Sequence, residues 1–197
     1  MTAEVHLRTA RGTRLPLHLE RWMGSPTSVE ELLLERVIPP ALDVGCGPGR
    51  LTLSLAQRGV PALGIDAAPT AVVIASGRGA PALRRSIFER LPGEGRWGTV
   101  ILVDGNVGIG GDPPTLLARL ARLLRPGGRA LIEAEPPGAP TDRIRVRIET
   151  RSDSGPFFPW ARVSIDDLPR LAVQAGFSVR ETISSPDRRW FAVLERP

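Results

Sequence analysis

The sequence predicts an α/β fold in which a mostly parallel, doubly wound sheet carries helices on both faces. Short apolar segments alternate with helix-like segments through most of the chain, which is typical of parallel strands joined by crossover helices. Two segments of alternating pattern around Pro186-Asp187 close the chain as a hairpin, so the final strand is expected to run antiparallel. The length of 197 residues suits one compact domain.

Seven segments carry a strand pattern and five carry a helix pattern. The expected strands are 41–45, 61–66, 81–88, 98–105, 129–135, 177–185 and 189–196. The expected helices are 27–37, 49–59, 69–79, 113–124 and 164–176. Thr27 or Ser28 can cap the first helix, Asp112 can cap the fourth, and Ser164 with Asp167 resembles a capping box for the last. Residues 1–25 are expected to be irregular, and 136–163 to begin with a proline-rich loop.

The composition argues against several classes of partner. All 26 basic residues are arginines, and they are spread along the chain without a dense block, so a nucleic-acid partner is not expected despite the net charge of +5. No stretch approaches the ~18 apolar residues that a membrane span requires, and the polar start of the chain predicts no signal peptide. Because Cys46 is the single cysteine, no internal disulfide can form, and a cytoplasmic location is expected.

The residue types also limit the chemistry. Lysine and tyrosine are absent, and histidine occurs only at His6 and His18. A general base would therefore be one of these histidines, a carboxylate or a water molecule. No group of His, Cys, Asp and Glu has the spacing of metal ligands, so no metal is expected.

The most informative segment is Leu42-Asp43-Val44-Gly45-Cys46-Gly47-Pro48-Gly49-Arg50, which joins the first strand to a helix. Its three glycines permit a tight turn and let a ligand approach the backbone, at the edge of the sheet where such folds bind ligands. The segment resembles the acidic-x-Gly-x-Gly-x-Gly motif of class I S-adenosylmethionine methyltransferases, since Asp43, Gly45, Gly47 and Gly49 occupy all four positions. The dinucleotide pattern G-x-G-x-x-G does not fit, because its third glycine would fall on Arg50 or Thr52.

The resemblance covers about residues 35–197 and includes the phrase LLRPGGRALIE. It implies a strand order of 3-2-1-4-5-7-6 and S-adenosylmethionine as cofactor, with S-adenosylhomocysteine as product. More narrowly, SIFERLPGEGRWGTVILVDGNVGIGGDP is similar to a group of actinobacterial methyltransferases. We expect a single domain over 1–197, divided into an N-terminal cap and first helix (1–38), a cofactor-binding half (39–135) and an acceptor-side loop, helix and hairpin (136–197).

The resemblance also implies which residues hold the cofactor. Asp66 ends the second strand, where an acid can accept hydrogen bonds from ribose hydroxyls, although it can also cap a helix. The third strand ends without the aspartate that often accepts the adenine amino group, and Ser86, Ile87 and Phe88 are the candidates there; Phe88 can equally be plain core. The expected cofactor-binding residues are Asp43, Gly45, Cys46, Gly47, Gly49, Asp66, Ala67, Ser86, Ile87, Phe88, Asp104 and Gly105.

Two segments are candidates for the acceptor side, 14–26 and 136–163. Their aromatic and arginine side chains could form a pocket, or IRVRIET could be an extra strand with outward arginines and the aromatics could seal the sheet edge. The candidate acceptor-binding residues are Trp22, Asn106, Phe158 and Trp160, and the candidate catalytic residues are His18 and Asp104.

The expected function is methyl transfer to a small-molecule acceptor by in-line displacement at the sulfonium methyl. The alternatives are a protein of the same fold that binds the cofactor without catalysis or with non-methylating chemistry, and, more remotely, a nucleotide-dependent oxidoreductase. The acceptor, its nucleophilic atom, any general base and the oligomeric state stay open.

Overall fold

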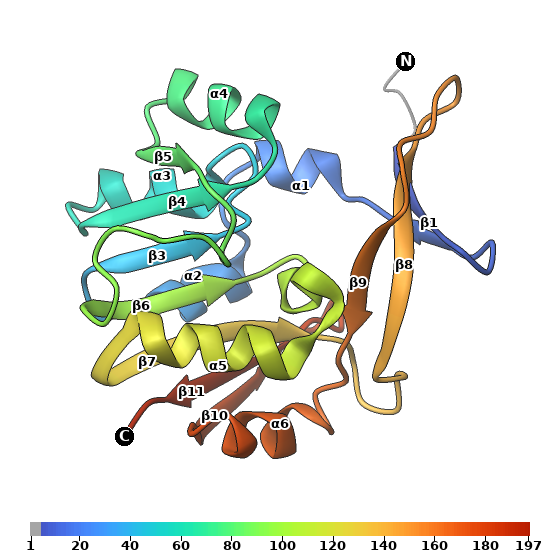
Figure 1. The fold of residues 1–197 in the computed structure, drawn as a ribbon. Coiled ribbons are helices and arrows are strands. Elements are labelled where there is room, and N and C mark those ends of the chain that lie inside the picture. Colours follow the sequence, from blue (N-terminus) through green and yellow to red (C-terminus); the bar gives the residue numbers. More distant parts are fainter. Residues whose placement is uncertain (1–4) are drawn as a thin grey trace.

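Seven strands form the central sheet of the computed structural model, which describes residues 5–197 (Figure 1). The strands are β3 (Ala41–Val44), β4 (Ala62–Asp66), β5 (Ala82–Arg84), β6 (Trp97–Leu102), β7 (Leu124–Ala134), β10 (Ser178–Ser184) and β11 (Trp190–Glu195). They lie in the order β5-β4-β3-β6-β7-β11-β10, and β11 is antiparallel to both its neighbours. The expected order 3-2-1-4-5-7-6 and the antiparallel last strand are therefore confirmed.

Helices cover both faces of this sheet, as expected. On one face, α2 (Ser28–Leu34) and α3 (Arg50–Gln57) bury leucines against β3, β6, β7 and β11. On the other face, α5 (Pro113–Leu123) and α6 (Leu168–Gln174) pack on alternate residues of the same strands. This alternation is what a strand covered on both sides requires. The helix α4 (Pro69–Gly77) packs beside β4 and β5.

A second sheet stands opposite the carboxyl ends of the central strands (Figure 1), and the sequence did not lead us to expect it as such. It has the order β2-β1-β8-β9, with β1 (His6–Thr9), β2 (Arg14–Pro16), β8 (Asp142–Glu149) and β9 (Phe158–Arg162). A short helix, α1 (Leu19–Met23), leads from β2 toward the central sheet.

Two expectations are thereby corrected. Within 1–25, the residues from 6 onward are not irregular but form two strands and a helix; residues 1–4 of that expectation lie outside the described part. The proline-rich loop is confined to the start of 136–163, and IRVRIET lies in a strand, which was the alternative interpretation. The physical reason is its period of two: Ile144, Val146 and Ile148 share one face of β8, and arginines take the other.

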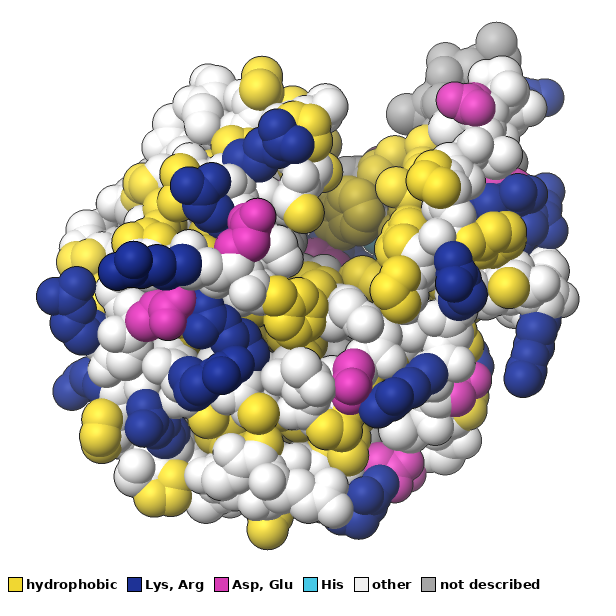
Figure 2. All heavy atoms as spheres, in the orientation of Figure 1, with side chains coloured by type: hydrophobic (Ala, Val, Ile, Leu, Met, Phe, Trp, Pro, Cys, Tyr) yellow, Lys and Arg dark blue, Asp and Glu magenta, His cyan; other side chains and the backbone are white. Residues whose placement is uncertain are grey.

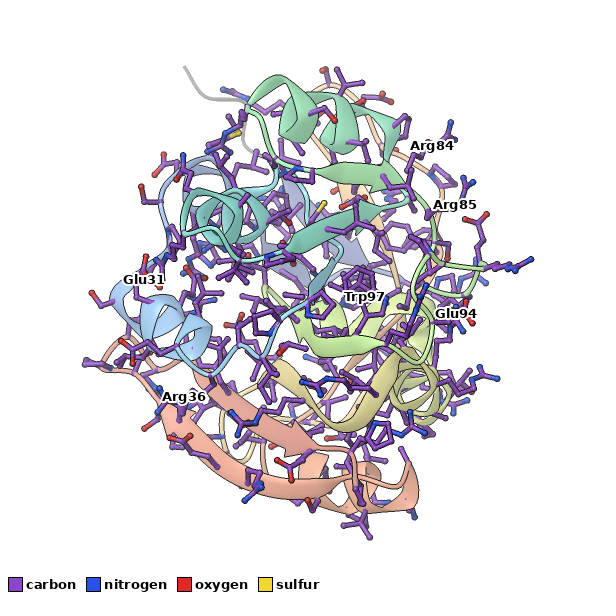
Figure 3. All side chains as sticks on the ribbon, turned by 90° about the vertical axis from the view of Figure 1, so that its left-hand side faces the viewer. Glu31, Arg36, Arg84, Arg85, Glu94 and Trp97 are labelled. Atoms are coloured by element: carbon purple, nitrogen blue, oxygen red, sulfur yellow. The ribbon has the colours of Figure 1, made fainter. Side chains whose placement is uncertain are left out.

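The third strand is shorter than the expected 81–88. Arg84 and Arg85 are exposed at this edge of the sheet and extend outward (Figure 3). Beyond them the Ser86 N–H donates to Glu89 Oε2 at 2.8 Å, and this bond closes a turn in place of a strand. By contrast Trp97, at the start of β6, lies in the core (Figure 3).

No helix within residues 5–197 combines the length and apolar character needed to cross a bilayer.

Candidate functional site

A cleft of about 1650 Å³ separates the carboxyl ends of the central strands from the second sheet. Figure 2 shows the hollow, with hydrophobic side chains gathered around it. Pockets for one drug-sized ligand are usually about 300–1,000 Å³. The cleft therefore has room for two ligands side by side, at the edge where doubly wound sheets bind them.

The glycine turn after β3 forms part of the cleft floor. The N–H groups of Gly45 and Cys46 donate to the Ile65 carbonyl at 2.8 and 3.0 Å, which ties the turn to β4. Gly45 has φ +69°, and a Cβ there would lie 2.6 Å from Asn106 Nδ2. A Cβ at Gly47 would meet no atom within 4 Å, so the backbone there is open to the cleft.

Asn106 holds this turn through its amide nitrogen. Its Nδ2 donates to the carbonyl oxygens of Val44 and Gly45 at 2.9 and 3.0 Å. Asn106 comes from η1 (Asn106–Gly111), a short helical segment after β6. The amide nitrogen is therefore occupied by the backbone, so Asn106 supports the glycine turn. Asn106 also lines the cleft, and its contact with an acceptor stays a prediction.

Asp43 and Cys46 lie beneath the turn. Asp43 is 4% exposed and accepts a hydrogen bond from Thr52 Oγ1 at 2.7 Å. Burial raises the pKa of Asp43 to about 6, against the lowering by the Thr52 bond and Arg50. Cys46 packs against Gly64, and burial raises the pKa of its thiol, so it is an inert neighbour of the site.

Asp66 is fixed by two backbone donors at the end of β4. The Gly47 N–H donates to Oδ2 at 2.9 Å, and the Ala68 N–H donates to Oδ1 at 2.8 Å. A carboxylate can accept about four hydrogen bonds, so Asp66 keeps acceptor capacity on the cleft wall. It bonds the backbone of Ala68, which is the N-cap of α4, and lines the cleft. Asp66 itself does not cap α4, so the capping interpretation was wrong.

Other predicted cofactor residues divide into two groups. Ala67, Ser86, Ile87, Asp104 and Gly105 line the cleft. Phe88 and Gly49 are not among the lining residues. The ring of Phe88 packs against Gly110, and Gly49 lets α4 approach closely, since a Cβ there would lie 2.9 Å from the Ala75 Cβ. Phe88 and Gly49 therefore both contribute to packing.

A buried ion-pair network joins the sheet wall, and sequence reasoning missed it. Arg189 Nε and Nη2 donate to the two oxygens of Glu133 at 2.8 Å, and Nη1 donates to Glu30 at 2.8 Å. Arg50 bonds Glu30 and donates to Asp104 Oδ2 at 2.6 Å. Ion pairs thus join five residues, which come from α2, α3, the end of β6, β7 and the residue before β11. No local pattern could reveal it, because its members are separated by up to 159 positions.

Asp104 is consequently a poor candidate for a general base. One of its oxygens accepts from Arg50, and the other lies 3.4 Å from Arg189 and 3.6 Å from Arg21. Burial raises the pKa of Asp104, with Arg50 opposing that change. The residue has φ +58°, and its N–H donates to Glu133 Oε2 at 2.6 Å. Its place in the network assigns it to shaping the cleft wall.

The opposite wall comes from α1 and the second sheet. His18, Trp22, Phe158 and Trp160 all line the cleft, as their expected roles require. Phe158 and Trp160 meet edge to face with ring centroids 6.1 Å apart. His18 is exposed and precedes α1. Apolar residues that were not predicted, among them Leu7, Leu15 and Ile148, line the same wall.

Within residues 5–197, no three His, Cys, Asp or Glu side chains are grouped as metal ligands.

Comparisons with known proteins agree with this geometry. Residues 41–128 match the family model described as a methyltransferase domain. A solved S-adenosylmethionine-dependent methyltransferase from Bacteroides fragilis, in complex with S-adenosyl-L-homocysteine, superposes with a TM-score of 0.79 at 22% identity, over 96% of this chain and 86% of that chain. The chain therefore has the class I methyltransferase fold, and its residues 41–128 are similar to a methyltransferase domain.

Two curated relatives match a shorter part. The trans-aconitate 2-methyltransferase of Deinococcus radiodurans is 36% identical over 104 residues, which is 51% of this chain and 39% of that protein. A 2-heptyl-1-hydroxyquinolin-4(1H)-one methyltransferase of Mycobacteroides abscessus is 39% identical over 88 residues, 40% of this chain and 39% of that protein. The chain thus matches about two fifths of the length of each of these relatives.

Proposed function

We propose that the protein is an S-adenosylmethionine-dependent methyltransferase that acts on a small molecule. One observation carries the proposal: the glycine turn and Asp66 lie side by side on the cleft floor and are held together, because the Gly47 N–H donates to the Asp66 carboxylate. An open glycine backbone beside a carboxylate with spare acceptor capacity fits the amino-acid and ribose parts of the cofactor.

In this proposal, the residues from 39–135 hold the cofactor. The turn of Gly45 and Gly47 would hold its methionine part, Asp66 its ribose, and Ser86 with Ile87 its adenine. When bound, S-adenosylmethionine supplies an electrophilic methyl group on a sulfonium. The chain's own contribution is to orient the acceptor in line with that methyl group and to exclude water.

A small acceptor is supported by the shape of the cleft and by the names of the two curated relatives, which both act on small molecules. The acceptor side would be formed by 1–38 and 136–197, from which the second sheet is built. A cytoplasmic location is part of the proposal, and the single buried Cys46 is compatible with it because no disulfide has to form.

Calorimetric titration with S-adenosylhomocysteine, S-adenosylmethionine and NAD tests the proposal. We expect the first two to bind and NAD to give no binding heat. The Asp66→Ala variant should bind S-adenosylhomocysteine roughly 100-fold more weakly, since hydrogen bonds to a charged group are lost.

The matched control is Asp153→Ala, which also removes a carboxylate that accepts a backbone N–H, from an exposed loop outside the cleft. It should bind like the wild type. Absence of binding by a folded wild-type protein, or equal affinity of Asp66→Ala and wild type, would refute the proposed function.

A further inference from the structure

Glu135 differs from the other carboxylates of the cleft. It follows β7 directly, lines the cleft and is partly buried. Its backbone is used, since its N–H donates to the Val163 carbonyl at 2.8 Å and its carbonyl accepts from the Ile165 N–H at 2.9 Å. Its carboxylate, in contrast, makes no hydrogen bond or ion pair with any residue in the described range 5–197.

The other cleft-lining carboxylates in that range all have partners. They are Asp43, Asp66, Asp104, Glu133 and Asp187, which accept from Thr52, backbone amides, Arg50, Arg189 and Ser185 respectively. Buried polar groups normally find hydrogen-bond partners within the protein. The carboxylate of Glu135, partly exposed on the cleft lining and without a protein partner, is instead available to a bound molecule.

The charged groups around Glu135 come from three elements. Glu133 lies two residues earlier on the same strand, and Asp142 and Arg162 lie in the second sheet. Arg162 does not neutralise Glu135, because its Nε and Nη2 donate to Asp142 at 3.0 and 2.9 Å. Burial raises the pKa of Glu135 most, Arg162 opposes this as the second-largest cause, and Glu133 and Asp142 then raise the pKa further. The group is thus a stronger base than an exposed glutamate.

The space in front of Glu135 is bounded by apolar surface. Val163 continues from β9 and pairs with Glu135, and Trp160 and Phe158 precede it along that strand. Further out, Leu7 and Ile148 are cross-strand partners in β1 and β8, and both line the cleft. Ile148 is 48% exposed, so this wall carries open apolar surface (Figure 2). Such surface favours an apolar or aromatic ligand body.

We propose that the acceptor is a predominantly apolar or aromatic molecule whose nucleophilic nitrogen or oxygen carries a proton, and that Glu135 accepts this proton. The inference rests on the proposed function. An acceptor that is itself a carboxylate would be repelled by Glu135, and Arg162, the arginine beside it, is already paired with Asp142.

The position of Glu135 suits this role. The β6 strand separates β3 from β7 in the sheet, so β3 and β7 lie about 10 Å apart at about 4.8 Å per strand spacing. By the register of the sheet, Glu135 lies three residues beyond the level of Val44, at the end of β3. A nucleophile held between Glu135 and the glycine turn uses its lone pair to form a bond to the methyl carbon. The carbon–sulfur bond breaks with its electron pair going to sulfur, which leaves a neutral thioether, and the proton of the nucleophile passes to the Glu135 carboxylate.

Three naphthalene probes test the inference by equilibrium binding to the complex with S-adenosylhomocysteine at neutral pH. These are 1-naphthol, 1-naphthylmethylamine and 1-naphthoate, which share the apolar body and differ in the group offered to Glu135. We expect the naphthol and the amine to bind about tenfold or more tightly than the carboxylate. In Glu135→Gln this preference should fall to about threefold or less, with S-adenosylhomocysteine affinity unchanged.

The control is Glu35→Gln, an exposed glutamate beyond α2 and outside the cleft, which should keep the wild-type preference. Equal or tighter binding of the naphthoate to wild type, no binding of any probe, or an unchanged preference in Glu135→Gln would each overturn the inference. The wild-type comparison stands even if the variant fails to fold. Failure of S-adenosylhomocysteine itself to bind would instead refute the proposed function, so the two failures are distinguishable.

Discussion

The two walls of the cleft are built on opposite principles. The wall at the ends of the central strands is polar, and its charges are paired with one another, since Arg50 and Arg189 form ion pairs with Glu30, Asp104 and Glu133. The wall from the second sheet is apolar and open. A wall whose charges are already paired keeps its shape for a constant ligand, whereas an apolar wall can select a variable one by shape and contact.

This contrast assigns the cofactor to the polar wall and the acceptor to the apolar wall. Glu135 stands at their junction, because it follows a central strand and pairs with the segment that continues β9. Its free carboxylate is the exception to the satisfied pattern of its own wall. Changes to the two walls should therefore affect different properties, and three variants test this from the largest expected effect to the smallest.

Removal of Arg189 should break the polar wall. Arg189 is 6% exposed, and Arg189→Met leaves Glu30 and Glu133 without their shared partner while keeping an apolar stem over Phe191. Leaving a buried charge unpaired costs about 3–5 kcal/mol of unfolding free energy. Guanidinium denaturation followed by circular dichroism measures this loss.

The control for Arg189 is Arg180→Met, which removes an exposed arginine paired with Glu195 on the last hairpin. Its denaturation midpoint should stay near that of the wild type. If Arg189→Met were as stable as this control, the network would not be what supports the wall.

Asp43→Asn should alter the dependence of stability on pH. Burial raises the pKa of Asp43 from 3.8 to about 6, so the folded protein binds its proton more tightly than the unfolded chain does. Its stabilising contribution is full below about pH 4 and is lost as pH rises through about 6. The variant cannot titrate, and its carbonyl oxygen can still accept from Thr52.

We therefore expect the wild type to lose stability relative to Asp43→Asn between about pH 4 and 6, and near pH 8 the variant to be more stable than the ligand-free wild type by up to about 3 kcal/mol. Unfolding titrations across this range measure it, with Asp153→Asn in an exposed loop as control. A wild type that gains stability relative to Asp43→Asn as pH rises through this range would contradict the sign of the effect.

Ile148→Ser should change only the apolar wall. The side chain is 48% exposed, so the unfolding free energy should fall by less than about 1 kcal/mol. Affinity for S-adenosylhomocysteine should not change, whereas 1-naphthol should bind about threefold to tenfold more weakly because apolar contact is lost. Val173→Ser, at a 66% exposed position of α6 outside the cleft, is the control and should affect neither ligand.

The sequence predicted one wall better than the other, because the two walls differ in how far apart along the chain their interacting residues lie. The glycine turn and Asp43 lie within seven positions, and their residue types alone indicate their roles. The part of the cleft floor proposed to hold the cofactor could therefore be predicted from the sequence. The second sheet pairs β1 with β8 across more than 130 positions, and the short strand β1 has no strong pattern of its own.

The same reason explains the individual misses. Asn106 looked like a free polar residue in a loop, because its carbonyl partners lie 61 and 62 positions away. Glu135 looked like the last residue of a strand, and only the tertiary structure shows that Arg162 is bound elsewhere and leaves it free. Local chemistry was predictable, and competition between distant partners was not.

A crystal structure of the protein with S-adenosylhomocysteine bound tests the central claim most directly. The account predicts the ribose hydroxyls on Asp66, the amino-acid part over Gly45 and Gly47, and the sulfur directed toward Glu135 and the apolar wall. Ligand density on the second sheet, or a sulfur directed away from β7 toward the β5 edge, would contradict it.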